Sequence, residues 1–524
     1  MAEDAEYSKL RWLRRRGAVL IFVAASFWPL QIVTANVIGI VRPERVVGLV
    51  LLVVVLGLLL VGVLNLVGLD AEAAENTSFL VIVLAMSAGP ILRQLGTLAY
   101  LVLVGFPILA GWLFVKLNGQ VIVTVLIWGT AVALAAGPAL AFIDGSQLEG
   151  GAGAIDETQF PPVTLSTKPD IFLVVFDGYP GAIAADQDQL QSGAVDIVSE
   201  LSARGFQIPD SSWAAYWNTT LSIPSLMEMN YPVMHNLWRA TETLQGLGEV
   251  LEGASATVET LRENGYRGVM IESGWSGASC GEYFDACVPS PWIDEAIYLI
   301  LRNTIAWPLL EDSPGPYALG TLAAFGWLFD HAPELSESST PEFVFVHVVS
   351  PHPPLRLSDD CSTSSLLKSS VASIDNLGVP SDIRDRRLIE QIDCADRLMV
   401  QLADKIDPND IVIFVSDHGT DRRSQSDPDL VDWSRETIIE RLNVFLALRL
   451  PNDCSVGDEV IVPNIIRLVL GCLSHSPIET LPERMWINPM AELEPGVVED
   501  LLSMRAVPGR VSSYKSVGPA HYSP

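Results

Sequence analysis

Four long apolar stretches dominate the first part of the chain. Three of them are long enough to cross a bilayer once as a helix. The third in order, residues 78–117, is about twice that length and is interrupted by Arg93, Gln94 and Gly96, so it predicts a hairpin of two shorter spans. The pattern predicts an N-terminal α-helical membrane domain of about five helices within residues 17–143. The stretches are residues 17–40, 46–69, 78–117 and 120–143.

From Pro169 onward the pattern changes to short apolar runs that alternate with amphipathic segments. The runs "DIFLVVFDG", "EFVFVHVV" and "DIVIFVSDH" are almost continuously apolar, which is typical of strands buried on both faces. Between the last two lies "DRRLIEQIDCADRLMVQLADKI", which has the periodicity of an amphipathic helix. The alternation predicts an α/β domain over residues 169–485, with a mostly parallel central sheet and helices on both faces.

The flanking segments define the expected topology. Residues 1–16 carry the basic cluster "KLRWLRRRG", which favours a cytoplasmic N-terminus. Five spans then place the α/β domain outside the cytoplasm, in a multi-pass protein of the plasma membrane. Residues 144–168 are rich in Gly, Pro, Ser and Thr and are a predicted linker. Residues 486–524 lose periodicity and are a predicted tail.

Charge and cysteine content narrow the possible partners and compartment. The chain of 524 residues has a formal net charge of −30, which argues against a nucleic-acid partner. All six cysteines follow the apolar stretches, and an even number in an oxidising compartment predicts disulfides. The connectivity does not follow from the sequence, and reduced structural thiols are the alternative. We expect neighbours in the chain to pair, as Cys280–Cys287, Cys361–Cys394 and Cys454–Cys472.

Polar residues follow three of the predicted strands. Asp177 follows the first, His352 follows the second, and Asp417 with His418 follows the third. Because the carboxyl ends of parallel strands share one edge, where ligands collect, we expect these side chains to converge. Carboxylates and imidazole are ligands for a divalent cation. The structural alternative is a turn, with the aspartate as a helix cap and Gly419 as the turn residue.

The loop "YWNTTLSIPS" supplies a hydroxyl group. Thr219 and Thr220 lie just before a predicted helix start, where free backbone N–H groups and the helix dipole favour an anion. A hydroxyl beside a cation that is held by two carboxylates and a histidine can lose its proton and attack phosphorus or sulfur. The combination predicts a metal-dependent hydrolase or transferase.

These stretches resemble the sulfatase-type branch of the alkaline phosphatase superfamily over roughly residues 168–485. Within that branch the chain looks most like membrane-anchored phosphoglycerol and phosphoethanolamine transferases, such as lipoteichoic acid synthase. Those enzymes also carry five N-terminal helices before an extracellular catalytic domain. The resemblance implies one divalent metal ion, Mn²⁺, Mg²⁺, Ca²⁺ or Zn²⁺, because no second set of ligands is evident. The implied metal-site residues are Asp177, Thr219, Asp417 and His418.

The resemblance also implies roles in the reaction. Thr219 matches the nucleophile, because it lies three residues before the Ser222 that opens the next helix, and Thr220 is the runner-up. His352 matches the histidine that contacts the phosphoryl or leaving group. Arg422 is a further candidate for binding the substrate's phosphate, although a solvated loop explains it equally well. His347, inside a strand, is expected to be a hydrogen-bonded core histidine.

One departure from the family separates two activities. Sulfatases carry Cys or Ser in the pattern C/S-x-P-x-R, but Leu226 stands here where the arginine should follow Ser222 and Pro224. We therefore expect a phosphodiester transferase or hydrolase that acts through Thr219 on a membrane lipid or a lipid-linked glycan. Sulfate ester hydrolysis is the enzymatic alternative. A non-catalytic family member that binds a glycan or a partner is the alternative of a different class.

Overall fold

A computed structural model gives the fold of the chain. It describes residues 19, 21, 22, 25, 26, 29, 43–69, 71–86, 160–188, 190, 196–231, 247–275, 277–306, 313–335, 338–363, 381–422, 433–451, 454–487 and 491–504.

A seven-stranded sheet forms the centre of the α/β domain, in the order β2-β8-β7-β1-β6-β4-β5. The strands from β7 to β5 are parallel, whereas β8 is antiparallel to both of its neighbours. The mostly parallel sheet is thus confirmed, with an antiparallel edge that the sequence did not indicate. The strands are β1 Ile171–Phe176, β2 Phe206–Gln207, β4 Arg267–Ile271, β5 Ala286–Val288, β6 Glu342–Val348, β7 Ile411–Ser416 and β8 Leu446–Arg449.

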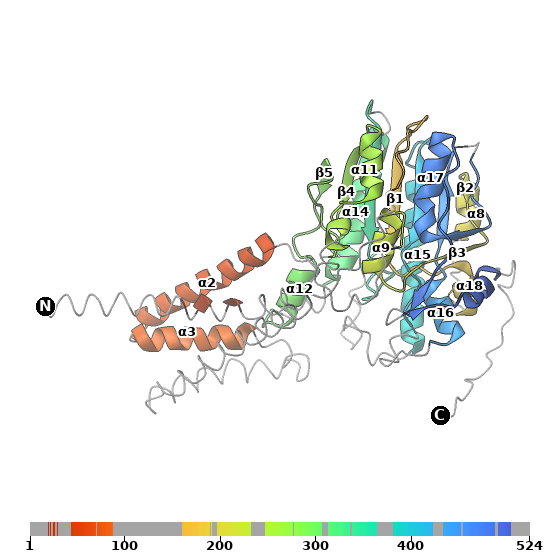
Figure 1. Cartoon of the computed structure of the whole chain (residues 1–524). Helices are drawn as coiled ribbons and strands as arrows, with labels where there is room; N and C mark the ends of the chain where they lie inside the picture. Colours follow the sequence, from red (N-terminus) through yellow and green to blue (C-terminus); the bar gives the residue numbers. More distant parts are fainter. Residues whose placement is uncertain are drawn as a thin grey trace, which may run out of the picture.

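Helices cover both faces of this sheet, as predicted (Figure 1). Successive residues of β1 point to opposite faces, so that Leu173 and Val175 join one apolar cluster while Phe172 and Val174 join the other. The first cluster includes residues of α9 Thr219–Met227, α11 Ala256–Glu263, α16 Arg435–Leu442 and α17 Ile465–Ser474. The second includes residues of α8 Ile197–Ser202, α14 Gly315–Leu335 and α15 Ser381–Ala403.

Smaller elements complete the domain and extend it beyond the predicted boundaries. In the predicted linker, Leu165 is buried in the core and Ser166 N donates to Leu473 O. In the predicted tail, Trp486 stacks on Tyr216 and Leu501 is fully buried. Apolar side chains at these positions have a core to join, which the local composition did not reveal. The elements are α7 Ala182–Gln187, β3 Ser211–Trp213, β9 Glu459–Ile461, η3 Val462–Asn464, β10 Trp486–Ile487, β11 Ala491–Glu492 and α18 Pro495–Leu502.

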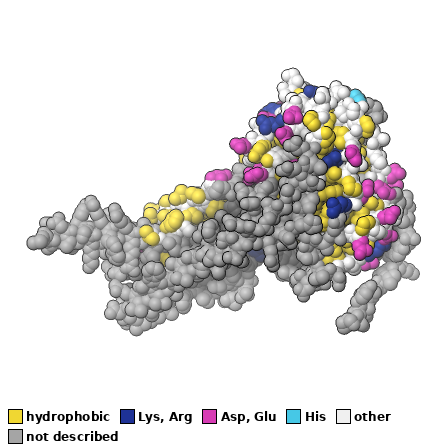
Figure 2. All heavy atoms as spheres, viewed as in Figure 1, with side chains coloured by type: hydrophobic (Ala, Val, Ile, Leu, Met, Phe, Trp, Pro, Cys, Tyr) yellow, Lys and Arg dark blue, Asp and Glu magenta, His cyan; other side chains and the backbone are white. Residues whose placement is uncertain are grey.

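Two apolar helices precede the soluble part, α2 Pro43–Leu66 and α3 Ala71–Met86. Among the described residues, α2 is the one helix that is long and apolar enough to cross a membrane. Apolar side chains cover its visible surface, while acidic side chains are spread over the soluble part (Figure 2). The predicted span 120–143, and most of 17–40 and 78–117, lie outside the described residues.

The cysteine prediction is confirmed. Disulfides join Cys280 to Cys287, Cys361 to Cys394, and Cys454 to Cys472, and no free cysteine remains among the chain's six. Each bridge closes a loop within the α/β domain, for which the sequence analysis predicted an oxidising compartment.

Candidate metal-dependent active site

The register of the sheet brings the two aspartates together. Phe176 of β1 lies beside Ser416 of the parallel neighbour β7, so the residues that follow, Asp177 and Asp417, leave the sheet side by side. Asp417 N donates to Phe176 O at 3.1 Å, which continues the pairing past the strand ends. Gly178 then turns with a φ of 73°, a conformation that favours glycine, and its N–H donates to Asp417 Oδ1 at 3.2 Å.

Helix α9 brings the threonine to the same place. Asn218 caps the helix by accepting a hydrogen bond from Leu221 N, and Thr219 is the first helical residue. Thr219 Oγ1 lies 3.2 Å from His418 Nε2, whereas Thr220 donates to Asn218 Oδ1 and is occupied there. The two candidate hydroxyl groups therefore have different surroundings at the start of α9. The hydroxyl of Thr219 contacts the residues that follow the strands, and the hydroxyl of Thr220 does not.

His418 lies at the centre of the group. Its Nδ1 is 2.9 Å from Gly419 O, so the proton belongs on Nδ1 and leaves Nε2 as an acceptor. Nε2 is 3.5 Å from Asp177 Oδ1 and 3.4 Å from Asp417 Oδ2. Ligand atoms around one tetrahedral ion at about 2.0–2.2 Å are roughly 3.3–3.6 Å apart, which matches these spacings.

Burial makes this group a fitting site for a cation. Asp177, Asp417 and His418 are each at most 3 % exposed, and Asp177 Oδ1 and Asp417 Oδ2 accept no hydrogen bond. Burial, together with the neighbouring Asp177, raises the pKa of Asp417 well above its usual range. Burial also lowers the pKa of His418 well below its usual range, and the charge of Arg441 adds to this. Two buried carboxylates with unpaired oxygens and a neutral imidazole are a donor set for a divalent ion.

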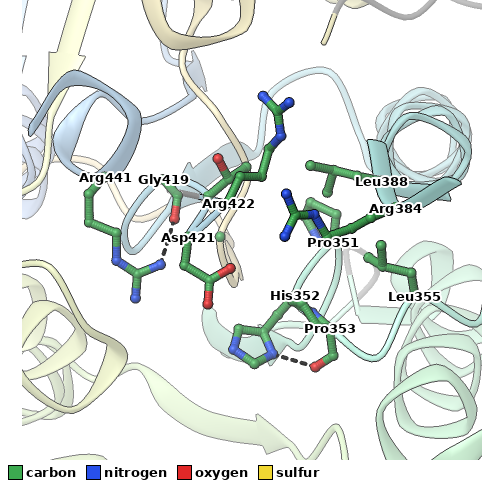
Figure 3. A pocket seen from close by; sticks show the side chains of 12 residues that line it. Pro351, His352, Pro353, Leu355, Arg384, Leu388, Gly419, Asp421, Arg422 and Arg441 are labelled. Carbon is green, nitrogen blue, oxygen red and sulfur yellow. Dashed lines mark hydrogen bonds between the residues drawn. The ribbon is translucent and has the colours of Figure 1, made fainter. Parts of the chain in front are cut away.

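His352 follows β6 and lies beside the aspartate turn. It lines a pocket together with Gly178 and Gly419, and its Nδ1 is 2.6 Å from Pro353 O (Figure 3). Burial lowers the pKa of His352, but the charges of Asp177 and Asp421 outweigh this, so that the pKa is raised overall. The structure therefore brings together Asp177, Thr219, Asp417 and His418, with His352 in the adjoining pocket.

Arg422 lines the same pocket, but its guanidinium group is already bonded. It donates to both carboxylate oxygens of Asp385, at 3.0 and 2.7 Å, and lies 3.4 Å from Asp188 Oδ2. The structure thus gives Arg422 a set of carboxylate partners that the sequence did not indicate.

Sequence reasoning misjudged His347. Both of its ring nitrogens are buried without a hydrogen-bond partner, and Nε2 lies 3.7 Å from Asp177 Oδ2. His347 pairs with Val175 in the sheet, and therefore points to the same face as Asp177. The available signal in the sequence was His347 itself, a polar residue inside the otherwise apolar run of residues 343–349.

Arg441, at the end of α16, was also missed. Its Nε donates to Trp217 O at 2.6 Å and its Nη1 donates to Gly419 O at 3.1 Å. One side chain therefore ties the loop before Thr219 to the loop after His418. No motif marks this arginine, because it acts through backbone carbonyls of segments distant in the sequence.

No family model matches the chain, and no curated protein sequence matches it. Solved structures that match include sulfatases, phosphoethanolamine transferases and other alkaline phosphatase superfamily members.

Three of these matches illustrate the range. The C-terminal periplasmic domain of EptC from Escherichia coli is 11 % identical, with 64 % of this chain and 97 % of that chain covered and a TM-score of 0.39. An alkaline phosphatase superfamily protein from Vibrio parahaemolyticus is 11 % identical, with coverages of 66 % and 80 % and a TM-score of 0.39. The phosphonate monoester hydrolase of Agrobacterium radiobacter is 14 % identical, with coverages of 61 % and 79 % and a TM-score of 0.37. The geometry of the site, and not these distant similarities, therefore decides which function is proposed.

Proposed function

We propose that the chain is a metal-dependent phosphodiester transferase or hydrolase with Thr219 as its nucleophile. The observation that carries this proposal is the meeting of Thr219 Oγ1 with His418 Nε2, beside two buried carboxylate oxygens that have no hydrogen-bond partner. Asp177, Asp417 and His418 would hold one divalent ion, with Thr219 beside it. A bound ion would lower the pKa of the threonine hydroxyl and neutralise charge on the transferred phosphoryl group.

With a cation bound, Thr219 would lose its hydroxyl proton to solvent. In the first half of the reaction, the deprotonated Thr219 Oγ attacks phosphorus and the bond from phosphorus to the leaving oxygen breaks. Thr219 is the first helical residue of α9, and the dipole of the helix favours the negative charge of the phosphoryl oxygens at this end. His352, which lines the adjoining pocket, donates a proton to the leaving oxygen. The product is a phosphothreonine ester on Thr219.

In the second half, an acceptor oxygen attacks the same phosphorus and releases Thr219. His352, now neutral, takes the proton of the attacking hydroxyl, which restores the starting state. Water as the acceptor makes the chain a hydrolase, and an alcohol makes it a transferase. The apolar helix α2 favours a membrane lipid or a lipid-linked glycan as one substrate, acted on outside the cytoplasm.

Sulfate ester hydrolysis has weaker support. Ser222, the residue that would be matured to formylglycine, is fully buried and donates its hydroxyl hydrogen to Tyr216 O. It therefore faces the core of the domain, while Thr219 faces the carboxylates.

The decisive experiment separates metal binding from nucleophilic attack. We expect Asp417→Asn to lose the metal, and Thr219→Ala to retain it but lose turnover of a phosphodiester by several orders of magnitude. Thr220→Ala is the matched control and should keep both. The measurements are elemental analysis, turnover, and mass spectrometry of the protein quenched during turnover.

A phosphoryl adduct on Thr219 in the wild-type protein would support the proposed intermediate directly. Activity that persists in Thr219→Ala but disappears in Thr220→Ala would move the nucleophile by one residue. Full metal content in Asp417→Asn would reject the metal site.

A further inference from the structure

A pocket beside the proposed metal site is lined by three arginines from three different segments (Figure 3). Arg384 comes from the first turn of α15, Arg422 follows β7, and Arg441 comes from the end of α16. The other walls are largely apolar, with Leu355 and Leu388 among them. Such a concentration of positive charge contrasts with the net charge of −30 of the whole chain.

The three arginines differ in how their charge is compensated. Arg422 is held by Asp385 and Asp188, as described above. Among the carboxylates of the described residues, Arg384 has a single neighbour, Asp385, at 3.8 Å, and its Nε is buried without a hydrogen-bond partner. Because Asp385 is bonded on both oxygens by Arg422, it compensates Arg384 weakly.

Arg441 is held by neutral groups. Its two hydrogen bonds go to the carbonyls of Trp217 and Gly419, and it has no carboxylate partner among the described residues. Asp421 is the acidic residue in the lining, and it raises the pKa of His352 through its charge. The guanidinium groups of Arg384 and Arg441 therefore line this pocket, and neither has a carboxylate of the described residues within hydrogen-bonding distance.

We propose that this pocket, through Arg384 and Arg441, binds a second anionic group of the substrate, a phosphate or carboxylate next to the phosphodiester that reacts. The inference rests on the proposed function, because the pocket shares Gly178, Gly419 and His352 with the proposed active site. A guanidinium group recognises such oxygens through paired, charge-assisted hydrogen bonds. The apolar walls strengthen these bonds by excluding water.

The proposal assigns different tasks to the two arginines. Arg384 lies at the far side of the pocket from Gly419 in Figure 3 and bonds to neither loop of the metal site, so it acts in substrate binding alone. Arg441 joins those loops, so its loss would disturb the reaction itself. Arg384 is therefore the residue whose substitution tests the subsite.

The experiment uses the full-length protein in detergent and two symmetrical phosphodiesters of equal length. The arms of one end in carboxylates, and those of the other end in hydroxyl groups. Binding is measured by calorimetry with Thr219→Ala protein, which does not consume the ligand. We expect the carboxylate diester to bind about tenfold or more tightly, as one charge-assisted hydrogen bond implies. Adding Arg384→Gln should abolish this preference.

Arg387→Gln is the matched control, because Arg387 lies on the same helix but pairs with Glu390 and does not line the pocket. It should leave the preference intact. Equal binding of the two diesters, no binding of either, or a preference that survives Arg384→Gln would overturn the inference. Turnover of the hydroxyl-ended diester by the wild-type protein tests the proposed function separately, because it does not depend on Arg384.

Discussion

At the scale of single residues, His347 is the side chain whose surroundings are hardest to explain without the metal site. It is 2 % exposed, and burial lowers its pKa to about 4 against the opposing charge of Asp177. A neutral imidazole next to Asp177 can fix the orientation of that carboxylate, as residues behind metal ligands commonly do.

We therefore expect His347→Ala to weaken metal binding about 10- to 100-fold, the usual cost of losing such support. The fold should survive, because the substitution removes one imidazole ring near the carboxyl end of β6 and leaves the strand in place. Competition with a chelator gives the metal dissociation constant, and circular dichroism monitors the fold. An unchanged dissociation constant would leave His347 with a packing role against Trp275, whose ring it contacts.

A second residue-scale prediction concerns the opposite end of β1. Asp170 accepts a hydrogen bond from Glu342 N, and burial raises its pKa to about 7, aided by the charge of Asp410. A carboxyl group with a raised folded pKa contributes stability below its unfolded pKa, and this contribution is lost as the pH rises through about 7.

Asp170→Asn keeps the acceptor oxygen but removes the charge. We expect the variant to unfold at a higher temperature than the wild type at pH 8, with a smaller difference at pH 5. Thermal unfolding of the full chain followed by tryptophan fluorescence is the measurement. A difference that is equal at both pH values would show that Asp170 does not titrate in this range.

At the scale of elements, site residues could be predicted from the sequence where a polar residue directly follows an apolar strand. Asp177, Asp417 and His418 were predictable because each follows an apolar strand, and parallel register then dictates that they meet. Arg441 was not predictable, because its partners are backbone carbonyls, which carry no sequence signal. The partners of Arg422 were equally hidden, since Asp385 lies on a helix distant in the chain.

The disulfide between Cys361 and Cys394 acts at this scale. It joins the segment after His352 to α15, the helix that carries Arg384, and closes a loop with a sequence separation of 33. We expect the double variant Cys361→Ser, Cys394→Ser to lose about 3–4 kcal/mol of unfolding free energy, from the entropy of a loop of this length.

The same variant should keep its metal, because neither cysteine contacts Asp177, Asp417 or His418. Chemical denaturation gives the change in stability, and elemental analysis gives the metal content. The disulfide between Cys454 and Cys472 closes a shorter loop, with a sequence separation of 18. The double variant Cys454→Ser, Cys472→Ser is therefore the control, and it should lose somewhat less unfolding free energy. Equal or larger loss in the control would show that loop length does not determine the effect.

At the scale of the whole molecule, α12 Glu295–Arg302 connects the apolar helices to the α/β domain within the part of the chain that the structure describes. Ile297 and Ile300 of α12 pack in one apolar cluster with residues of α2 and α3. Arg45 of α2 bonds to Asp294, which caps α12, at 2.8 Å, and both side chains are largely buried. On the far side, Glu295 of α12 bonds to Tyr317, whose ring contacts His352. A continuous set of contacts therefore leads from α2 to the proposed active site.

Removing one partner of a buried ion pair leaves the other charge uncompensated and typically costs about 3–5 kcal/mol, so Arg45→Ala should loosen α12 from α2. Hydrogen exchange should then rise in α12 while β1 and β7 remain protected. Turnover of a phosphodiester lipid in vesicles should fall much more than turnover of a soluble diester, because the metal site itself is intact. Arg45→Lys, which keeps a positive charge beside Asp294 and leaves the cap of α12 in place, is the control and should show much smaller changes in both measurements. Equal losses toward the two substrates would mean that Arg45 supports the fold of the domain in general, and not its placement relative to the membrane.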